Sequence, residues 1–208
     1  WLIEADENGE IAIDTETNSL DPHQATLVGI SLCAKIGKAC YIPIGHKNGN
    51  ILNKEIVLKK IKKTLEDKSI KKIGQNIKFD FIVLHRHGIE MNSMEDTMLM
   101  SYALDAGRNR HNMDTLSEIH LEHKTIKFKE IVGSGKNQIN FSEVDVNIAK
   151  DYAAEDADIT FRLYKKFYIK LREENLVNIY EIFEKPLIKI LAKMEIHGIK
   201  IDNKFLSV

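Results

Sequence analysis

The chain has 208 residues, of which 43% are hydrophobic, so it can bury one substantial core. Its 30 basic and 31 acidic residues nearly cancel, so net charge gives no signature of polyanion binding, and contact with nucleic acid would need local patches or bound cations. No apolar run approaches the roughly 20 residues that cross a bilayer, and two cysteines without C-x-x-C spacing do not make a disulfide framework, which predicts reduced thiols in a cytosolic protein.

Short β-branched runs, separated by Gly and Asp-Pro, open the chain and predict three consecutive strands: 11–13, 27–34 and 39–44. An amphipathic stretch at 54–67 and an apolar run at 70–74 then predict a helix followed by a buried strand. Apolar residues at helical spacing predict further helices: 80–87, 97–104, 115–121 and 145–171. A last amphipathic helix within 179–197 is expected to begin near Pro186, because proline is tolerated in a helix's first turn. This order indicates an α/β domain with a helical second half.

An acidic pair, Asp14 and Glu16, lies at the end of the first predicted strand. Residues two apart in a strand point to the same side, so both carboxylates would project together and repel unless a cation lies between them. Hard oxygen donors favour Mg²⁺ or Mn²⁺ over Zn²⁺, for which His or Cys ligands would be expected. Solvated surface acids are the alternative interpretation, since other acidic pairs in the chain share this spacing.

A further acid, Asp80, follows the run Gly74-Gln75-Asn76, where an apolar strand ends and an apolar helical run follows. Open α/β sheets bind their ligands at strand ends, which makes Asp80 a candidate ligand. An Asp at such a point is also a common helix cap. The expected convergence of Asp80 with the other acids favours its interpretation as a ligand.

The long predicted helix carries Tyr152 and Asp156, which lie four residues apart and therefore on one face. A packed Tyr beside a surface Asp is the alternative. Small residues at Ala153, Ala154 and Ala157 would let this helix approach the sheet closely, which favours a site.

Two other patterns predict no site. Residues 133–136, Gly-Ser-Gly-Lys, are similar to part of a phosphate loop, but Glu130 stands where the first Gly belongs and Asn137 where Ser or Thr should follow, so we expect a surface loop. Histidines at 85/87 and 120/123 have no third convergent ligand, which favours solvated or packed histidines.

Taken together, the acidic segments resemble the exonuclease motifs of the DEDD superfamily: Asp14-Thr15-Glu16, Gly74-Gln75-Asn76 with Asp80, and Tyr152 with Asp156. The Tyr in the last motif indicates the Tyr-type branch. Flanking stretches are similar to the proofreading 3′–5′ exonuclease domain of bacterial DNA polymerase I, almost end to end: 41–46, 96–99, 111–116, 123–126, 135–138 and 152–158. The motif order together with these flanks makes the resemblance specific.

The resemblance implies an α/β, RNase H-like exonuclease fold, with a mixed central β-sheet flanked by α-helices. It implies an exonuclease domain over 1–183 and, over 184–208, the start of the connection to a polymerase domain that the chain does not contain. Because the carboxylates and the Tyr all stand at their motif positions, the resemblance implies an active nuclease rather than a vestigial scaffold.

By the same resemblance, Asp14, Glu16 and Asp156 would hold one divalent cation, Mg²⁺ or Mn²⁺. Asp14 would also bridge to a second such cation, held by Asp80 through water. A cation pair of this kind stabilises the attacking and the leaving oxygen of an in-line displacement. Tyr152 and Glu16 would orient the attacking water, and the products would be a nucleoside 5′-monophosphate and a new 3′-hydroxyl.

The implied substrate is a single-stranded or frayed 3′ end of DNA, because a paired terminus must first be unstacked and a mismatch lowers that cost. This preference would make the activity proofreading. Leu20 and Phe128 match family positions that wedge or stack against terminal bases, although core packing would use the same residue types. Other residues match positions that contact the strand: Gln75, Asn76 and Arg110.

Two alternatives stay open. An RNA-processing exonuclease of the RNase D type shares these motifs, and a strand-binding or structural module could keep the fold without turnover. The other partner implied is the rest of a DNA polymerase I chain. We expect no membrane association, a monomeric isolated domain, and work on the nucleoid in the bacterial cytoplasm.

Overall fold

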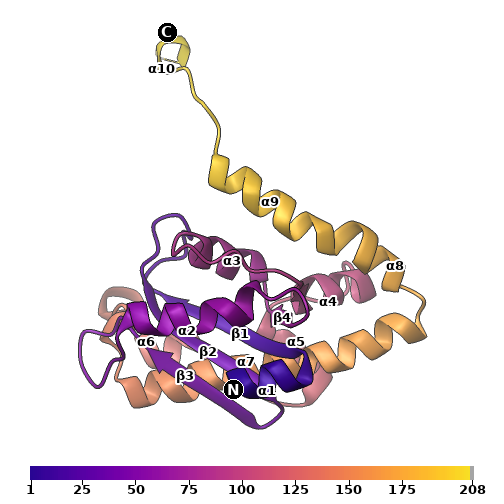
Figure 1. Ribbon diagram of the computed structural model, residues 1–208, viewed down its shortest axis with the longest axis horizontal. Helices are drawn as coiled ribbons and strands as arrows, with labels where there is room; N and C mark the ends of the chain where they lie inside the picture. Colours follow the sequence, from indigo (N-terminus) through magenta and orange to yellow (C-terminus); the bar gives the residue numbers. More distant parts are fainter. Residues whose placement is uncertain (207–208) are drawn as a thin grey trace.

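A five-stranded sheet with the strand order β3-β2-β1-β4-β5 forms the centre of the computed structural model, which describes residues 1–206 (Figure 1). The strands are β1 (Glu10–Thr17), β2 (Leu27–Lys35), β3 (Lys38–Pro43), β4 (Lys71–Gly74) and β5 (Met94–Asp96). β1, β2 and β3, the three strands that the opening runs predicted, are antiparallel, whereas β4 and β5 continue the sheet in parallel from β1. The predicted mixed sheet is confirmed.

The longer helices are α2 (Lys54–Glu66), α3 (Ile77–His85), α4 (Thr97–Asp105), α5 (Met113–Leu121), α7 (Val146–Glu173) and α9 (Lys185–His197). Each corresponds to a helix predicted from spacing, although α3 begins at Ile77 instead of Asp80. The short helices are α1 (Leu2–Asn8), α6 (Phe128–Val132), α8 (Val177–Ile179), α10 (Asn203–Leu206), the 3₁₀ turns η1 (Gly135–Asn137) and η2 (Phe141–Glu143), and the π-helix η3 (Tyr180–Glu184). The prediction did not include α1, α6 or β5, because so few residues show no periodicity.

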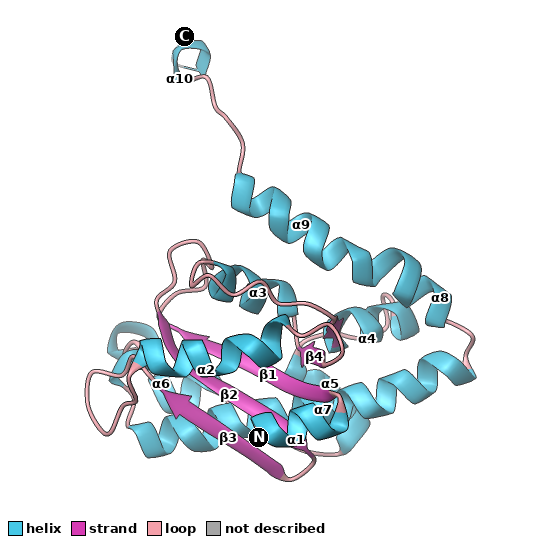
Figure 2. Ribbon diagram, viewed as in Figure 1, coloured by secondary structure: helices cyan, strands magenta, loops and turns pink. Residues whose placement is uncertain are grey.

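Helices cover both faces of the sheet, as Figure 2 shows for α2 and α7. Alternation along β1 sends Ile11 and Ile13 to one face, where they join buried residues of α2 and α3. Ala12 points to the opposite face and packs in the cluster formed with α7. Because side chains alternate, Asp14 and Glu16 lie on the α7 side as well.

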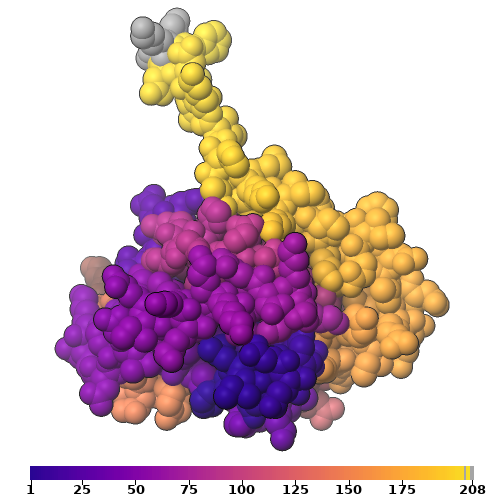
Figure 3. Space-filling model, in the orientation of Figure 1, coloured from indigo at the N-terminus to yellow at the C-terminus, as the bar shows by residue number. Residues whose placement is uncertain are grey.

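The C-terminal helix α9 packs back on the body of the molecule through Ile188 and Ala192, which are buried in the same cluster as α3. It follows directly on α8 and the π-helix η3, and Ile179 and Glu184 at the two junctions keep helical backbone, so the helical stretch begins at Val177 and the predicted beginning near Pro186 is wrong. The wider π turn before Pro186 accommodates a residue that has no N–H to donate. Beyond this helix the chain leaves the body, as the space-filling view shows (Figure 3).

The domain division into 1–183 and 184–208 stays a prediction. Across the described residues, no helix has both the length and the apolar character needed to cross a bilayer.

Candidate active site

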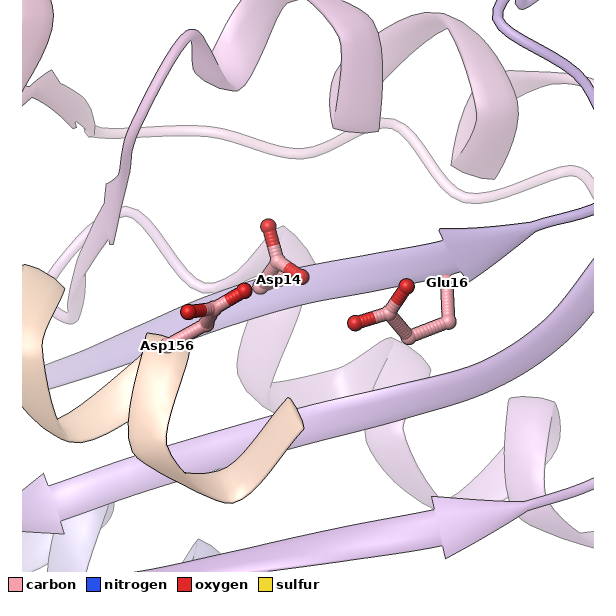
Figure 4. A group of neighbouring side chains, drawn as sticks. All are labelled: Asp14, Glu16 and Asp156. Carbon is pink, nitrogen blue, oxygen red and sulfur yellow. The ribbon is translucent and has the colours of Figure 1, made fainter. Parts of the chain in front are cut away.

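The site forms where β1 continues beyond its parallel neighbour. β4 pairs with β1 only from Glu10 to Ala12, so the following part of β1 has a free edge on that side. Asp14 and Glu16 stand on this extension, and Asp156 approaches from α7 (Figure 4). Each offers a carboxylate oxygen, and these oxygens lie within 4.8 Å of one another.

Close contact between α7 and the sheet brings Asp156 into the cluster. Ala153 and Ala157 are fully buried, as expected for small residues at a helix–sheet contact. Tyr152 stands one turn earlier on the same helix, close enough to Asp156 for the carboxylate to raise the pKa of its hydroxyl. The prediction that these two side chains share one face is therefore confirmed.

Asp80 takes a different position from the one that a cap would occupy. It lies inside α3, whose N-cap is Asn76, a residue with a left-handed φ of 62°. Its Oδ1 accepts hydrogen bonds from the Thr15 backbone N–H (2.9 Å) and hydroxyl (2.5 Å). Thr15 stands between the two acids of β1, on the strand edge that β4 leaves free. Asp80 is therefore adjacent to the three-carboxylate cluster without being a member of it.

The carboxyl groups of the site are all shifted towards the protonated form. Burial raises the pKa of Asp14 to about 6. Burial also raises the pKa of Glu16, and the charges of Asp14, Asp156 and Asp80 raise it further. For Asp80 and Asp156, burial and then the charge of Asp14 raise the pKa well above the usual range, and hydrogen bonds from Thr15 and Tyr152 oppose this. These shifts show that the protein alone does not offset the negative charge it concentrates here.

The residues present fit a divalent cation. Glu16 Oε1 is buried and has no hydrogen-bond partner within the described part of the chain, so an acceptor points into the site unused. Three carboxylates and no His or Cys make a hard oxygen donor set, which suits Mg²⁺ or Mn²⁺. The acidic cluster is therefore suited to divalent-metal use.

An aromatic group borders the cluster. Tyr152 lies 6.1 Å, between ring centroids, from Phe128, which stacks on Phe141 at 6.2 Å with an interplanar angle of 4°. Phe128 is still 43% exposed and Leu20 is 95% exposed. The alternative interpretation, that these residues only pack in the core, is therefore wrong for Leu20. For Phe128 it explains only the buried part of the side chain.

The other residues predicted to contact the DNA strand differ in whether their side chains already make hydrogen bonds within the protein. Asn76 and Arg110 are exposed. Gln75 is bound at both ends of its amide, since Nε2 donates to His111 O (2.8 Å) and Oε1 accepts from the Thr97 hydroxyl. Gln75 therefore braces the segment beside Arg110 in the chain, a role that its position in the motif did not indicate.

Asp96 is a buried residue for which the sequence suggested no role. Its carboxylate accepts backbone N–H bonds from Asn76 and Ile77 at the start of α3 and from Met98 and Leu99 at the start of α4. One side chain thus caps both helices and fixes the helix that carries Asp80. The Asp-Thr directly before the apolar run 98–100 was the available signal, because Asp is a preferred N-cap residue.

The patterns that predicted no site behave accordingly. Residues 135–137 form the 3₁₀ turn η1 between surface residues, and no strand leads into it. His85 pairs with Glu90 and His123 with Glu155, while the ring of His120 packs against Phe167. Among the described residues, Asp14, Glu16 and Asp156 are the one group of three such side chains whose ligand atoms lie close enough together to share a metal ion.

Comparisons with known proteins agree with this geometry. A family model described as 3′-5′ exonuclease matches residues 1–172. A DNA polymerase I of Rhizobium leguminosarum is 43% identical over 228 residues, which cover all of this chain and 22% of that protein. In fold, the chain is similar to Brucella melitensis NrnC with bound Mg²⁺ (TM-score 0.71, 22% identity, 94% of this chain and 89% of that one). Escherichia coli RNase D, an exoribonuclease, gives a TM-score of 0.70 at 17% identity over 93% of this chain and 47% of that one.

The mixed sheet, with an acidic cluster over the end of its central strand, has an RNase H-like fold. The family model that matches it makes this class of protein a nuclease. The chain belongs to the 3′-5′ exonuclease family whose model covers 1–172. It is an exonuclease domain that spans about a fifth of the length of the DNA polymerase I that it matches.

Proposed function

We propose that this chain removes nucleotides one at a time from the 3′ end of DNA and acts as the proofreading activity of a DNA polymerase I. The observation that carries the proposal is the convergence of Asp14, Glu16 and Asp156 beside Tyr152, next to a half-exposed aromatic surface. The similarity of the whole chain to about a fifth of a bacterial DNA polymerase I supports DNA as the substrate.

Two divalent cations, Mg²⁺ or Mn²⁺, are the proposed cofactors. Asp14, Glu16 and Asp156 would hold one, and Asp80 would serve the other through water, with Asp14 shared. When bound, such ions offset the charge that develops on the phosphate and on the leaving oxygen. The raised pKa values of Asp14, Glu16, Asp80 and Asp156 support this assignment, because the carboxylates need a positive counter-charge to ionise together.

Tyr152 and Glu16 would orient the water that attacks the terminal phosphodiester. Burial, and then the charges of Asp156, Glu16 and Asp14, raise the pKa of Tyr152, so its hydroxyl keeps its proton at neutral pH and its oxygen can accept a hydrogen bond from the water. The unpaired Oε1 of Glu16 can accept a hydrogen bond from the same water. The water oxygen forms the new bond to phosphorus and loses a proton, the bond from phosphorus to the 3′ oxygen breaks, and the departing 3′ oxygen takes up a proton. The products are a nucleoside 5′-monophosphate and a strand ending in a 3′-hydroxyl.

The proposed substrate is a single-stranded or frayed terminus. Leu20 and Phe128 both expose apolar surface on which terminal bases could stack, and Phe128 lies next to Tyr152. Gln75, Asn76 and Arg110 are proposed to contact the DNA strand. Gln75 would also hold His111, the neighbour of Arg110, in place. Unstacking a paired end costs free energy that a mismatched end has partly lost already, which would select errors for removal.

The rest of a DNA polymerase I chain is the proposed partner, and nucleoid DNA in the bacterial cytoplasm the proposed place of work, both by similarity to the Rhizobium protein. An isolated domain is proposed to be monomeric. An exoribonuclease of the RNase D type is the second candidate, because the fold of RNase D is similar.

One experiment separates these possibilities. Matched single-stranded DNA and RNA, labelled at the 3′ end, are incubated with the protein with Mn²⁺, with Mg²⁺ or with EDTA. We expect release of labelled mononucleotide from DNA, slower release from RNA, and none in EDTA. RNA degraded faster than DNA would favour the RNase D type. Binding of DNA without product release under any condition would favour a strand-binding module and overturn the proposal.

A further inference from the structure

The residue beside Asp156 faces another part of the molecule. Glu155 follows Tyr152 by three residues on α7, and its side chain, 19% exposed, uses both carboxylate oxygens. Oε1 lies 2.7 Å from His123 Nε2, which must donate because a carboxylate accepts, and Oε2 accepts the Ile126 backbone N–H at 2.7 Å. Glu155 therefore binds the segment 122–127 at two points.

This segment joins α5 to α6 and carries no helix or strand of its own. Bonds from α5 hold it on one side, since the Ser117 hydroxyl donates to His123 O (2.9 Å) and Asp114 accepts from Thr125. Glu155 holds it against α7. The segment is thus fixed between the helix that carries the catalytic acid and a second helix of the same face.

The element that depends on this anchoring is α6. It has five residues, begins at Phe128 and has no side-chain cap at its N-terminus. So short a helix has little stability of its own, and its position is set by what holds its ends. Val132 fixes the end of α6 by burial, whereas the bond from Glu155 to Ile126 fixes the chain two residues before Phe128.

The contacts of α7 with the segment and with α6 are therefore related. Glu155 binds Ile126, and Tyr152 lies 6.1 Å, between ring centroids, from Phe128. Without the carboxylate, the chain before α6 would keep its bonds to α5 and lose those to α7. The position of the Phe128 ring would then depend only on its stacking on Phe141 and on the burial of Val132, so its distance from the cluster would be less tightly held.

We propose that Glu155 is a positioning residue for the 3′-terminal bases: it holds segment 122–127 so that Phe128 stands beside Tyr152 at the mouth of the site. This inference rests on the proposed function, because it assigns Phe128 to the DNA end. It goes beyond that function by giving two neighbouring acids of α7 different roles. Asp156 takes part in the chemistry, and Glu155 places the substrate.

The test compares Glu155→Ala, Glu155→Gln and the control Asp151→Ala with the parent protein on single-stranded DNA carrying a fluorescent 3′ nucleotide. Asp151 is exposed, pairs with its neighbour Lys150, and lies on α7 one turn before Glu155. Gln keeps an acceptor for Ile126 and can donate to the exposed His123 ring. For Glu155→Ala we expect KM to rise about tenfold, the order of magnitude of one lost stacking contact, with kcat within about threefold of the parent. Glu155→Gln and Asp151→Ala should have near-parental KM.

Hydrogen exchange provides a readout that does not depend on activity. In Glu155→Ala, the amides of 123–132 should exchange faster, while those of β1 and the centre of α7 should stay protected. If Glu155→Ala fails to fold, as judged by circular dichroism, His123→Ala removes one of the two contacts and should shift KM and exchange in the same direction by less.

Parental KM in Glu155→Ala, a fall in kcat at unchanged KM, or no recovery in Glu155→Gln would each overturn the inference. A parent protein that releases no nucleotide from DNA would instead overturn the proposed function. In that case hydrogen exchange alone would decide whether Glu155 anchors segment 122–127.

Discussion

Asp80 reaches from α3 to Thr15 on β1 and accepts hydrogen bonds from both its backbone N–H and its hydroxyl, at 2.9 and 2.5 Å. The two residues are 65 positions apart in the chain, since α3 follows β4 whereas β1 opens the sheet. The bonds are possible because β4 stops pairing at Ala12 and leaves the edge of β1 open. These two hydrogen bonds thus fix Asp80 against the strand that carries Asp14 and Glu16.

Removal of the Thr15 hydroxyl should loosen this arrangement. Thr15→Val keeps the shape and the backbone bond but leaves Asp80 with one donor fewer, so the free energy of unfolding should fall by about 1–2 kcal/mol. Activity should fall about tenfold, as expected if the ligand loses about 1.4 kcal/mol of orientation. Thr160→Val is the control, because the buried Thr160 hydroxyl has no partner among the described residues. Equal activities of the two variants would contradict the role given to Thr15.

Loss of one carboxylate of the cluster should abolish catalysis while the fold survives. Asp156→Asn and Asp14→Asn should each lower divalent-dependent nucleotide release by at least about 10³-fold, since removal of a single transition-state donor already costs about that much. Asp158→Asn is the control, because Asp158 lies two residues further on and pairs with Arg162. Parental rates in either cluster variant would remove that residue from the site.

Tyr152→Phe should be slower than the parent but active. The hydroxyl orients water in the proposed mechanism, whereas the ring, which packs near Phe128 and Phe141, is retained. We expect a loss of about 100-fold in kcat with little change in KM. Tyr168→Phe, with the same chemical change in the second half of α7, should behave as the parent does. A Tyr152→Phe enzyme as fast as the parent would show that the hydroxyl has no part in the reaction.

Stability without metal should fall as pH rises through the site's titration. Burial raises the pKa of Asp14 to about 6 from an unfolded value near 4, so between these values the folded chain binds more protons than the unfolded one. The free energy of unfolding therefore decreases with rising pH in this window. In EDTA, Asp14→Asn should match the parent near pH 4 and exceed it by on the order of 1–2 kcal/mol at pH 7.

Thermal unfolding followed by circular dichroism measures this difference. Added Mn²⁺ should stabilise the parent at pH 7 and have little effect at pH 4, because protons and cations compete for the same carboxylates. Asp14→Asn should respond less to Mn²⁺. A parent protein that becomes more stable relative to Asp14→Asn as pH rises in EDTA would contradict the electrostatic account of the cluster.

The exposed side chain of Leu20 should affect substrate binding and not folding. Leu20→Ala removes a side chain that is 95% exposed, so its melting temperature should stay within about 1 °C of the parent. KM for single-stranded DNA should rise about fivefold, in the range of a partial base contact. Ile36→Ala is a matched control, because Ile36 is also exposed but lies in the turn between β2 and β3. An unchanged KM for Leu20→Ala would remove Leu20 from the substrate surface.

Much of this molecule was predictable because its signals are local. Strand alternation put Asp14 and Glu16 on one side, and helical spacing joined Tyr152 to Asp156; the structure brings the acids within 4.8 Å. The predicted strands and long helices are present for the same reason. Other features depended on partners far away in sequence: Asp80 binds Thr15 instead of capping a helix, and Asp96 caps two helices at once.

The sequence by itself determined which acids could meet, the class of chemistry they suit and the family to which the chain belongs. Only the tertiary structure decided that Leu20 is exposed, that Gln75 is used internally, and that Glu155 holds the chain before Phe128 while its neighbour Asp156 joins the cluster. The physical reason is that periodicity fixes the direction of a side chain within its own helix or strand. Its partner is set by where α3 and α7 pack on opposite faces of the sheet, and by where β4 ends beside β1.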